Sequence, residues 1–176
     1  MSRRVQICVS GGSKADPELA RLAEAVGRGI AQAGAVLVCG GRGGVMEAAA
    51  RGAADAGGEV VGILPGTSPD EGNPHVTYVI ATGIGHARNL AVVASADAVI
   101  AIGGEWGTLS EIAYARRLER PVIALESWSL SGRAAMKGGP GIEPAESAEE
   151  AVAMAMARAE ARRESTLSPG SDFPDP

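Results

Sequence analysis

Three glycine-rich segments have the residue types and spacing of phosphate-binding turns. They are VSGGSK (9–14), CGGRGGVM (39–46) and IGGEWGTLSE (102–111), and each joins an apolar run to a helical pattern. Glycine lets backbone N–H groups approach an anion, and the start of a helix adds a favourable dipole. The alternative is that these glycines serve only tight turns. The residues expected to hold a phosphate are Gly11, Gly12, Ser13, Gly41, Arg42, Gly43, Gly44, Arg88, Gly103, Gly104, Gly107 and Thr108.

Glu111 and Arg88 are the candidate catalytic residues. Glu111 follows Thr108 by three positions, which is the spacing of a capping box with Thr108 as the helix N-cap. The same carboxylate could serve as a general base or accept a hydrogen bond from a ligand hydroxyl, and the two roles are compatible. Arg88 follows TGIGHA, where its planar guanidinium could pair with a phosphate. An exposed helix arginine is the alternative.

Trp106 stands out because only 3% of the residues are aromatic. It could cover a flat ring of a ligand, or it could anchor a subunit interface, where aromatic side chains are enriched. The segment GTSPDEGNP (66–74) has the length and composition of a mobile flap. His86, close to Arg88, is expected to make local contacts and not to act as an acid.

Several kinds of site are disfavoured by what the sequence lacks. No glycine turn shows G-x-G-x-x-G with an acidic residue about 20 positions later, which argues against an NAD site, and no G-x-x-x-x-G-K-[ST] segment is present. The chain has two histidines, and its two cysteines, Cys8 and Cys39, fall in apolar runs. We therefore expect reduced, buried thiols, no metal site and no cofactor required for catalysis.

Charge and hydropathy predict a cytoplasmic protein that binds neither nucleic acid nor membrane. The net charge is −5, whereas a nucleic-acid footprint usually needs a basic face. The apolar runs are short, far below the roughly 20 residues needed to cross a bilayer. A strand is expected almost at the N-terminus, so we expect no signal peptide.

Short apolar runs alternate with longer helical patterns, which predicts an α/β fold: one Rossmann-like domain (1–163) whose doubly wound parallel sheet lies between two layers of helices. Because the carboxyl ends of parallel strands share one edge, the glycine turns should meet there. Residues 164–176 are polar and rich in proline, which predicts a disordered tail. Strands are expected over 5–10, 35–41, 59–66, 75–82, 97–104 and 121–127, with a short one around Ile142, and helices over 15–34, 44–58, 85–96, 107–120 and 146–163.

Together these segments resemble the LOG family, long labelled "possible lysine decarboxylase", over about residues 5–160. The segments CGGRGGVMEAAARGA, GHARN and GGEWGTLSE carry the resemblance. The family includes cytokinin-activating phosphoribohydrolases and the molybdenum cofactor carrier proteins. In the LOG enzymes P-G-G-x-G-T-x-x-E supplies the phosphate turn and a catalytic glutamate, and an upstream Arg-Lys pair supplies a catalytic arginine. The resemblance implies that Gly103, Gly104, Gly107, Thr108 and Glu111 form that turn and that Arg88 is that arginine.

Two departures from the LOG pattern bear on activity. Ile102 replaces the proline before the glycines, and Asn89 replaces the lysine after the arginine. Both leave phosphate binding intact and leave hydrolysis open. The segment LPGTSPDEGNPHVTYVIATGIGHARN is closer to the carrier branch. The decarboxylase label does not fit, because such an enzyme needs a dedicated lysine for pyridoxal phosphate and the chain has only Lys14 and Lys137, each in an expected loop.

The resemblance implies binding of a small phosphorylated ligand, either the molybdenum cofactor or a nucleoside monophosphate, at the carboxyl edge of the sheet. A molybdenum-cofactor-carrier-like protein is the first expectation. The alternative is a nucleoside 5′-monophosphate phosphoribohydrolase, in which water attacks C1′ and releases the free base and ribose 5-phosphate. A nucleotide-sensing domain without turnover is a third hypothesis. Members of the family are usually dimers or tetramers, so a homo-oligomer is expected.

Overall fold

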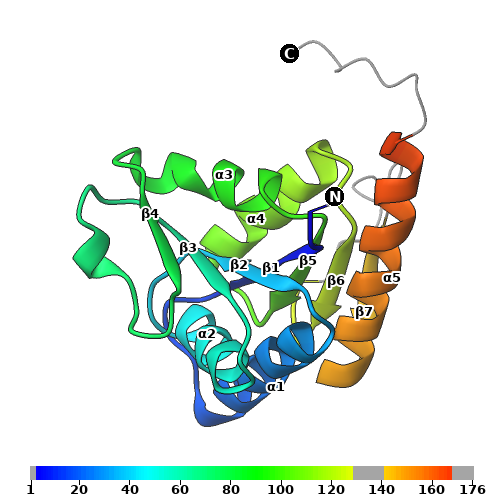
Figure 1. Ribbon diagram of the computed structural model, residues 1–176, viewed down its shortest axis with the longest axis horizontal. Coiled ribbons are helices and arrows are strands. Elements are labelled where there is room, and N and C mark those ends of the chain that lie inside the picture. Colours follow the sequence, from blue (N-terminus) through cyan, green and yellow to red (C-terminus); the bar gives the residue numbers. More distant parts are fainter. Residues whose placement is uncertain (1–2, 129–140, 168–176) are drawn as a thin grey trace.

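The computed structural model describes residues 3–128 and 141–167, which form a seven-stranded sheet whose neighbouring strands all run parallel (Figure 1). The strand order is β4-β3-β2-β1-β5-β6-β7. The predicted α/β fold with a doubly wound parallel sheet is therefore confirmed. The strands are β1 Gln6–Gly11, β2 Val36–Cys39, β3 Val60–Leu64, β4 Tyr78–Ala81, β5 Ala98–Ile102, β6 Val122–Leu125 and β7 Ile142–Ala145.

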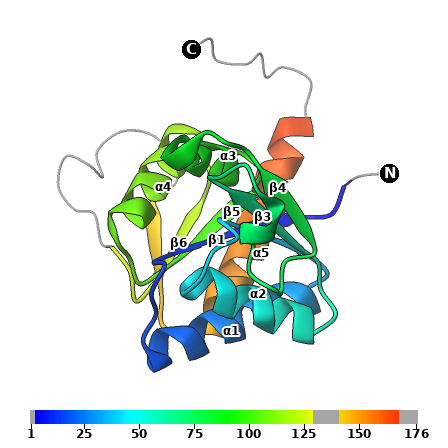
Figure 2. The same ribbon diagram turned by 90° about the vertical axis from the view of Figure 1, so that its left-hand side faces the viewer.

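Helices cover both faces of the sheet and bury two separate apolar cores. On one face α1 (Pro17–Gln32), α2 (Val45–Asp55) and α5 (Ala148–Leu167) pack over the sheet. On the other face α3 (Arg88–Ala94) and α4 (Trp106–Arg117) cover a smaller core. Figure 2 shows the resulting three layers, with α1 and α2 below the sheet and α3 and α4 above it.

The strand order reverses between β1 and β5, and this switch point prepares the ligand site. The two strands pair in parallel from Ile7↔Ala98 to Gly11↔Ile102. From β1 the chain turns to α1 on one face, whereas from β5 it turns to α4 on the other. The two connections diverge, and in open α/β sheets this divergence creates a crevice outside the carboxyl ends of the strands.

The start of α1 follows directly from its sequence. Asp16 is the N-cap, and its Oδ1 accepts hydrogen bonds of 2.9 Å from the backbone N–H groups of both Glu18 and Leu19. Pro17 occupies the first helical position, where its missing N–H costs nothing. This cap fixes where the loop that leaves β1 must end.

The predicted start of α4 is wrong, and the error concerns the candidate site. The helix begins at Trp106 with Glu105 as its N-cap residue, whereas the capping box places the N-cap three positions later, at Thr108. Thr108 lies inside the first turn and is buried, so it cannot serve as the cap. Glu111 consequently has no capping role, and its carboxylate makes other contacts. The T-x-x-E spacing therefore places Thr108 and Glu111 in the candidate site and does not form a helix cap.

At the C-terminal end the structure extends the prediction. The expected short strand around Ile142 is β7, which pairs with β6. Helix α5 continues to Leu167, so the first four residues of the expected tail are helical. The rest of that tail, 168–176, and Lys137 lie outside the described residues.

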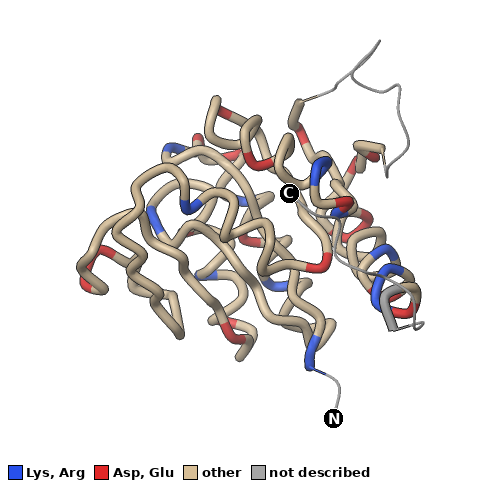
Figure 3. Tube along the Cα trace, turned by 90° about the horizontal axis from the view of Figure 1, so that it is seen from above, with Lys and Arg blue, Asp and Glu red and all other residues tan. Residues whose placement is uncertain are grey.

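Two global properties of the described residues bear on partners. None of the helices in the described ranges is long and apolar enough to cross a bilayer. Lysine and arginine are interspersed with aspartate and glutamate along the chain, as Figure 3 shows from above.

Candidate functional site

A cavity of about 200 Å³ opens at the switch point between β1 and β5. It brings together the turn after β1, the start of α3 and the first turns of α4, which are distant in sequence. Seven of the residues expected from the sequence line it. The lining residues are Gly11, Gly12, Ser13, Met46, His86, Arg88, Asn89, Glu105, Gly107, Thr108 and Glu111.

Arg88, the first residue of α3, brings an almost buried positive charge to this cavity. Its side chain is 11% exposed, and its Nη1 lies 3.6 Å from Oε1 of Glu111. The Nε and Nη1 atoms are buried and have no hydrogen-bond partner in the described part of the chain. Buried guanidinium donors are normally satisfied, so these two donors remain free for a ligand.

Gly40, which directly follows β2, makes room for the Arg88 guanidinium. A Cβ placed on Gly40 would lie 2.1 Å from Nη1 and 2.6 Å from Nη2 of Arg88. Any side chain at this position would push the guanidinium out of its place. The absence of a side chain at Gly40, after β2, therefore leaves the space that the Arg88 guanidinium from α3 occupies.

Glu111 is held between Ser10 and Arg88. Its side chain is 8% exposed. The Ser10 hydroxyl, at the end of β1, donates a short hydrogen bond to Oε2, and Arg88 lies beside Oε1. Burial raises the pKa of Glu111, and this effect outweighs the lowering by the Ser10 hydrogen bond and the Arg88 charge. The Glu111 carboxylate thus partly neutralises the charge of Arg88, although burial of the carboxylate disfavours its charged form.

The first turn of α4 supplies neutral donors next to these charges. Gly107 and Thr108 line the cavity from the helix start, where unpaired backbone N–H groups and the helix dipole favour an anion. Thr108 is only 2% exposed, and its Oγ1 has no hydrogen-bond partner among the described residues. An unsatisfied buried hydroxyl on a residue that lines the same cavity adds a third unused donor.

One acidic side chain stands at the mouth of the cavity. The Glu105 carboxyl lies over the turn after β1, because a Cβ on Gly12 would be 3.2 Å from its Cδ and Oε1. Glu105 is exposed, and an exposed side chain of this length can swing away without disturbing packing. An anionic ligand must displace it or bind beneath it.

Asn89 ties α3 to α4 next to the charged pair. It is buried, and its Nδ2 donates a 3.0 Å hydrogen bond to Oγ of Ser110, which in turn donates a 2.7 Å bond to the carbonyl of Gly107. The residue that replaces the expected lysine therefore joins the two helices that carry Arg88 and Glu111. Asn89 therefore both joins the helices and lines the cavity.

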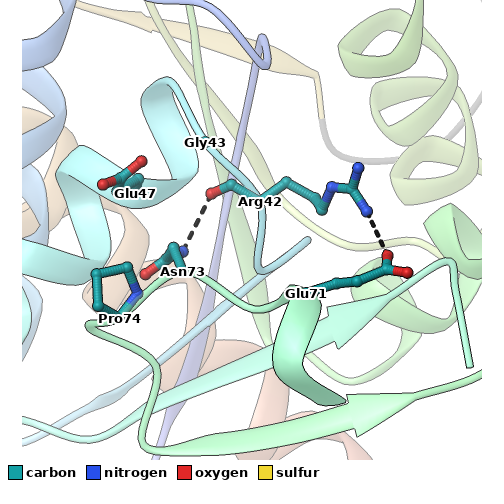
Figure 4. A pocket seen from close by; sticks show the side chains of 6 residues that line it. All are labelled: Arg42, Gly43, Glu47, Glu71, Asn73 and Pro74. Atoms are coloured by element: carbon teal, nitrogen blue, oxygen red, sulfur yellow. Dashed lines mark hydrogen bonds and ion pairs between the residues drawn. The ribbon is translucent and has the colours of Figure 1, made fainter. Parts of the chain in front are cut away.

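The residues of the second glycine turn, 39–46, have two roles: some support the turn after β1, and others line a separate cavity. Gly44 has a φ of 67° and packs on the backbone of Ser13, so it supports the turn after β1. Arg42 and Gly43 line another cavity, of about 340 Å³, together with Glu47, Glu71, Asn73 and Pro74. In Figure 4 the Arg42 side chain points toward Glu71, and Nη1 lies 2.7 Å from Oε2 of that carboxylate. Its guanidinium therefore does not join Arg88, and Gly41, at φ 69°, is likewise absent from the switch-point lining.

Gly103 and Gly104 do not line the switch-point cavity. They line a different one, of about 330 Å³, with Glu126, Ser127 and Trp128. The chain has two residues, Glu105 and Trp106, between Gly104 and Gly107, whereas the LOG pattern has one. The longer turn starts α4 at Trp106 and separates the first two glycines from the third.

The two cysteines lie beneath the site and are free thiols. Burial raises the pKa of Cys8 well above its ordinary value and that of Cys39 to about 11, so both remain protonated. Within residues 3–128 and 141–167, no group of three or more His, Cys, Asp and Glu side chains is arranged to hold a metal ion.

Sequence reasoning missed several residues of this site. Ser10 is the penultimate residue of β1 and Gly40 directly follows β2. Both fall within expected strands, where side chains are normally assigned to the core. Glu105 falls at a position that the phosphate-turn pattern leaves unspecified. A simple signal existed for the first two, because a serine and a glycine that end buried apolar strands at the carboxyl edge are candidates for ligand or side-chain contacts.

Comparison with known sequences gives a family match over almost the whole described chain. Residues 4–165 match the model of the SLOG cluster4 family. An uncharacterized protein of Archaeoglobus fulgidus is 48% identical over 122 residues, which cover 69% of this chain and 80% of that protein.

Two solved structures are similar in both sequence and fold. A molybdenum cofactor binding protein from Rippkaea orientalis is 37% identical with a TM-score of 0.81, and the match covers 89% of this chain and 98% of that one. The molybdenum cofactor carrier protein of Chlamydomonas reinhardtii is 32% identical with a TM-score of 0.78, again over 89% of this chain and 98% of that one.

Proposed function

The chain belongs to the SLOG cluster4 family, which confirms the predicted resemblance, and we propose that it binds a phosphorylated ligand of the pterin or nucleotide type. The phosphate lies in the switch-point cavity. Arg88 pairs with it, while the turn after β1 and the first turn of α4 donate backbone N–H groups. The protein acts as a molybdenum-cofactor-carrier-like binding protein.

The observation that supports this proposal is the set of unused buried donors in one cavity. Arg88 Nε, Arg88 Nη1 and Thr108 Oγ1 are buried and have no hydrogen-bond partner within the described ranges. Leaving such groups unsatisfied costs about 1–3 kcal/mol each. A phosphate has enough acceptor oxygens to satisfy all three donors. Its negative charge also offsets the positive charge of Arg88, which Glu111 only partly neutralises.

The likeness to carrier proteins supports the pterin class in particular. The relatives from Rippkaea orientalis and Chlamydomonas reinhardtii are named for molybdenum cofactor binding and carriage. Molybdenum would reach this chain as part of its cargo. We therefore propose a pterin phosphate as the first ligand class and a purine nucleoside monophosphate as the second.

The test is to identify what the protein carries. Protein purified under anaerobic conditions is analysed by native mass spectrometry, and its melting temperature is measured with GMP, AMP and 6-hydroxymethylpterin phosphate at millimolar concentration. A ligand at 100 times its Kd should add about 2.7 kcal/mol of stability. No copurified phosphorylated compound and no rise in melting temperature with any of the three would contradict the proposal.

A second candidate function is phosphoribohydrolase activity, favoured by the raised pKa of Glu111. A buried carboxyl with a raised pKa is suited to proton transfer near neutral pH. Oε2 accepts the Ser10 hydrogen bond, however, and Oε1 faces the Arg88 charge at 3.6 Å without a hydrogen bond. This supports a holding role over the activation of water. Release of free base from a nucleoside monophosphate by the wild type, abolished in Glu111→Gln with the fold intact, would establish the enzyme. Absence of base release supports the binding protein.

We also propose that the chain forms a homo-oligomer. Four large apolar side chains are 41–54% exposed: Tyr78 and Ile80 on the edge strand β4, Ile84 in the following loop and Leu90 on α3. Unpaired sheet edges with exposed apolar side chains are commonly covered by a partner. Light scattering coupled to size exclusion measures the mass, and a monomer at micromolar concentration would contradict this proposal.

A further inference from the structure

Both tryptophans of the chain lie together beside the turn that ends β5. The ring centroids of Trp106 and Trp128 are 5.9 Å apart, and the planes are tilted by 35°. Trp128 packs against Gly104, since a Cβ there would be 2.4 Å from its Nε1. Trp106 is nevertheless 80% exposed. The chain thus presents a large aromatic face to solvent, supported from behind by a second aromatic ring.

Trp128 of this aromatic pair lines a cavity that carries unsatisfied polar atoms. The cavity of about 330 Å³ is lined by Gly103, Gly104, Glu126, Ser127 and Trp128, and the last three residues also line a neighbouring cavity of about 370 Å³ along β6 and β7. Ser127 Oγ and Trp128 Nε1 are buried without a hydrogen-bond partner in the part of the chain that is described. Two unused polar groups in an aromatic cavity indicate a binding site for a polar flat molecule.

Glu126 adds a carboxylate at the same place and in an unusual backbone conformation. Its φ is 50°, and it directly follows β6. The other such residue in the described chain, Glu119, has a φ of 54°, but it follows α4, where a left-handed residue is the ordinary way to end a helix. Glu126 has no helix end to explain it. Glycine would adopt this backbone without strain, so the glutamate side chain is present at an energetic cost.

The chemistry of these groups discriminates among flat rings. Aromatic side chains stack on heterocycles of any kind. A carboxylate pairs with two parallel N–H groups, as in the bidentate recognition of a guanidinium. Guanine and pterins present such an edge, made of the ring N–H and the 2-amino group of a 2-amino-4-oxopyrimidine. Adenine presents one amino group beside a ring nitrogen that has only a lone pair, which a carboxylate repels.

We propose that this cavity is the ring subsite of the ligand and that it selects a 2-amino-4-oxopyrimidine ring. Trp106 stacks on the ring, and Glu126 accepts hydrogen bonds from its amino edge. The subsite is next to the phosphate cavity along the chain: Gly103 and Gly104 line the subsite, and Glu105 and Gly107 of the same loop line the phosphate cavity. This inference rests on the proposed function and specifies the ligand class of the same site.

The experiment uses intrinsic fluorescence, because the only two tryptophans of the chain are the proposed platform. GMP, AMP and ribose 5-phosphate are titrated into the full-length protein, and the affinities are confirmed by calorimetry. We expect GMP to quench the fluorescence and to bind at least tenfold tighter than AMP. Trp106→Ala should weaken GMP binding about tenfold, and Glu126→Gln should remove the preference for GMP over AMP. Glu119→Gln is the matched control, because it changes an exposed left-handed glutamate at the opposite edge of the sheet.

The outcomes separate this inference from the proposed function. Equal affinities for GMP, AMP and ribose 5-phosphate, unchanged by Trp106→Ala and Glu126→Gln, would overturn the ring subsite and leave the phosphate site standing. No binding of any of the three would instead count against the proposed function itself. A change in oligomer mass on Trp106→Ala, with GMP affinity unchanged, would show that Trp106 is an interface residue and would also overturn the ring subsite.

Discussion

The guanidinium of Arg88 lies directly on Gly40, where a Cβ would approach Nη1 to 2.1 Å. Gly40 directly follows β2, and Arg88 begins α3, so the cation that we assign to the phosphate is positioned by the turn after a neighbouring strand. The phosphate site is thus built by four elements: the turn after β1, the end of β2, and the starts of α3 and α4.

Gly40→Ala should therefore weaken ligand binding, although the new side chain does not contact the ligand. The new methyl group displaces the Arg88 side chain, and we expect GMP affinity to fall about tenfold, the equivalent of one charge-assisted contact of roughly 1.4 kcal/mol. Calorimetric titration measures the loss. Because the effect acts through Arg88, Gly40→Ala should not lower GMP affinity any further in a protein that already carries Arg88→Gln. Additive losses in the double variant would contradict this mechanism.

Glu111→Gln should change how stability depends on pH. Burial raises the pKa of Glu111 above 4.5, its ordinary value, so the native state binds its proton more tightly than the unfolded chain does. The stabilisation from this proton is fully present below about pH 4.5 and is lost as pH rises through the raised pKa. The free energy of unfolding of Glu111→Gln relative to wild type should therefore increase between pH 5 and pH 8 in urea titrations. A relative decrease would show that pairing with Arg88 lowers the pKa instead.

Arg3→Ala should show the opposite pH dependence through Asp97. Burial alone would raise the pKa of this carboxyl, but hydrogen bonds from Arg3 and from the Gln6 N–H, together with the Arg3 charge, lower it below 3.8. The stabilisation is present above pH 3.8 and lost as pH falls through the lowered pKa. Because Arg3 is half exposed, we expect a loss of only about 1–2 kcal/mol at pH 7, which shrinks below pH 4. Arg4→Ala, which removes an exposed pair with Glu59, is the control and should change stability by less than about 0.5 kcal/mol.

The flap should depend on Asn73 more than on its visible ion pair. The Asn73 side chain donates a 3.0 Å hydrogen bond to the Arg42 carbonyl and accepts one of 3.1 Å from the His75 N–H (Figure 4 shows the first). The Arg42 and Glu71 side chains are 46% and 45% exposed, and exposed pairs contribute little. Asn73→Ala should speed amide hydrogen exchange in the flap about tenfold, whereas Glu71→Gln should leave it within twofold. The reverse order would show that the ion pair holds the flap.

The fold was predictable from the sequence because its signals are local. Alternating apolar runs and helical patterns indicated the parallel sheet, and Asp16 with Pro17 marked the start of α1 correctly. The rules of parallel connections lead us to expect a switch point with a crevice at the carboxyl edge, whereas the order of the seven strands comes from the structure.

The details of the site were less predictable because they depend on tertiary contacts. The T-x-x-E spacing fits a capping box, but α4 begins at Trp106, and Glu111 turns to Ser10 and Arg88 instead. Ser10, which donates a hydrogen bond to the buried Glu111 carboxylate, lies 101 positions away in the sequence. Local spacing cannot reveal such a partner. In the same way, three glycine turns at one edge do not imply one cavity, since Gly103 and Gly104 line another.

The central claim is that Arg88 binds the phosphate of the ligand, and the most direct test compares GMP with guanosine by calorimetric titration. We predict that wild type binds GMP at least tenfold tighter than guanosine, and that Arg88→Gln loses this difference while its affinity for guanosine stays unchanged. Equal affinities of wild type for GMP and guanosine, or a preference for GMP that survives in Arg88→Gln, would contradict the account.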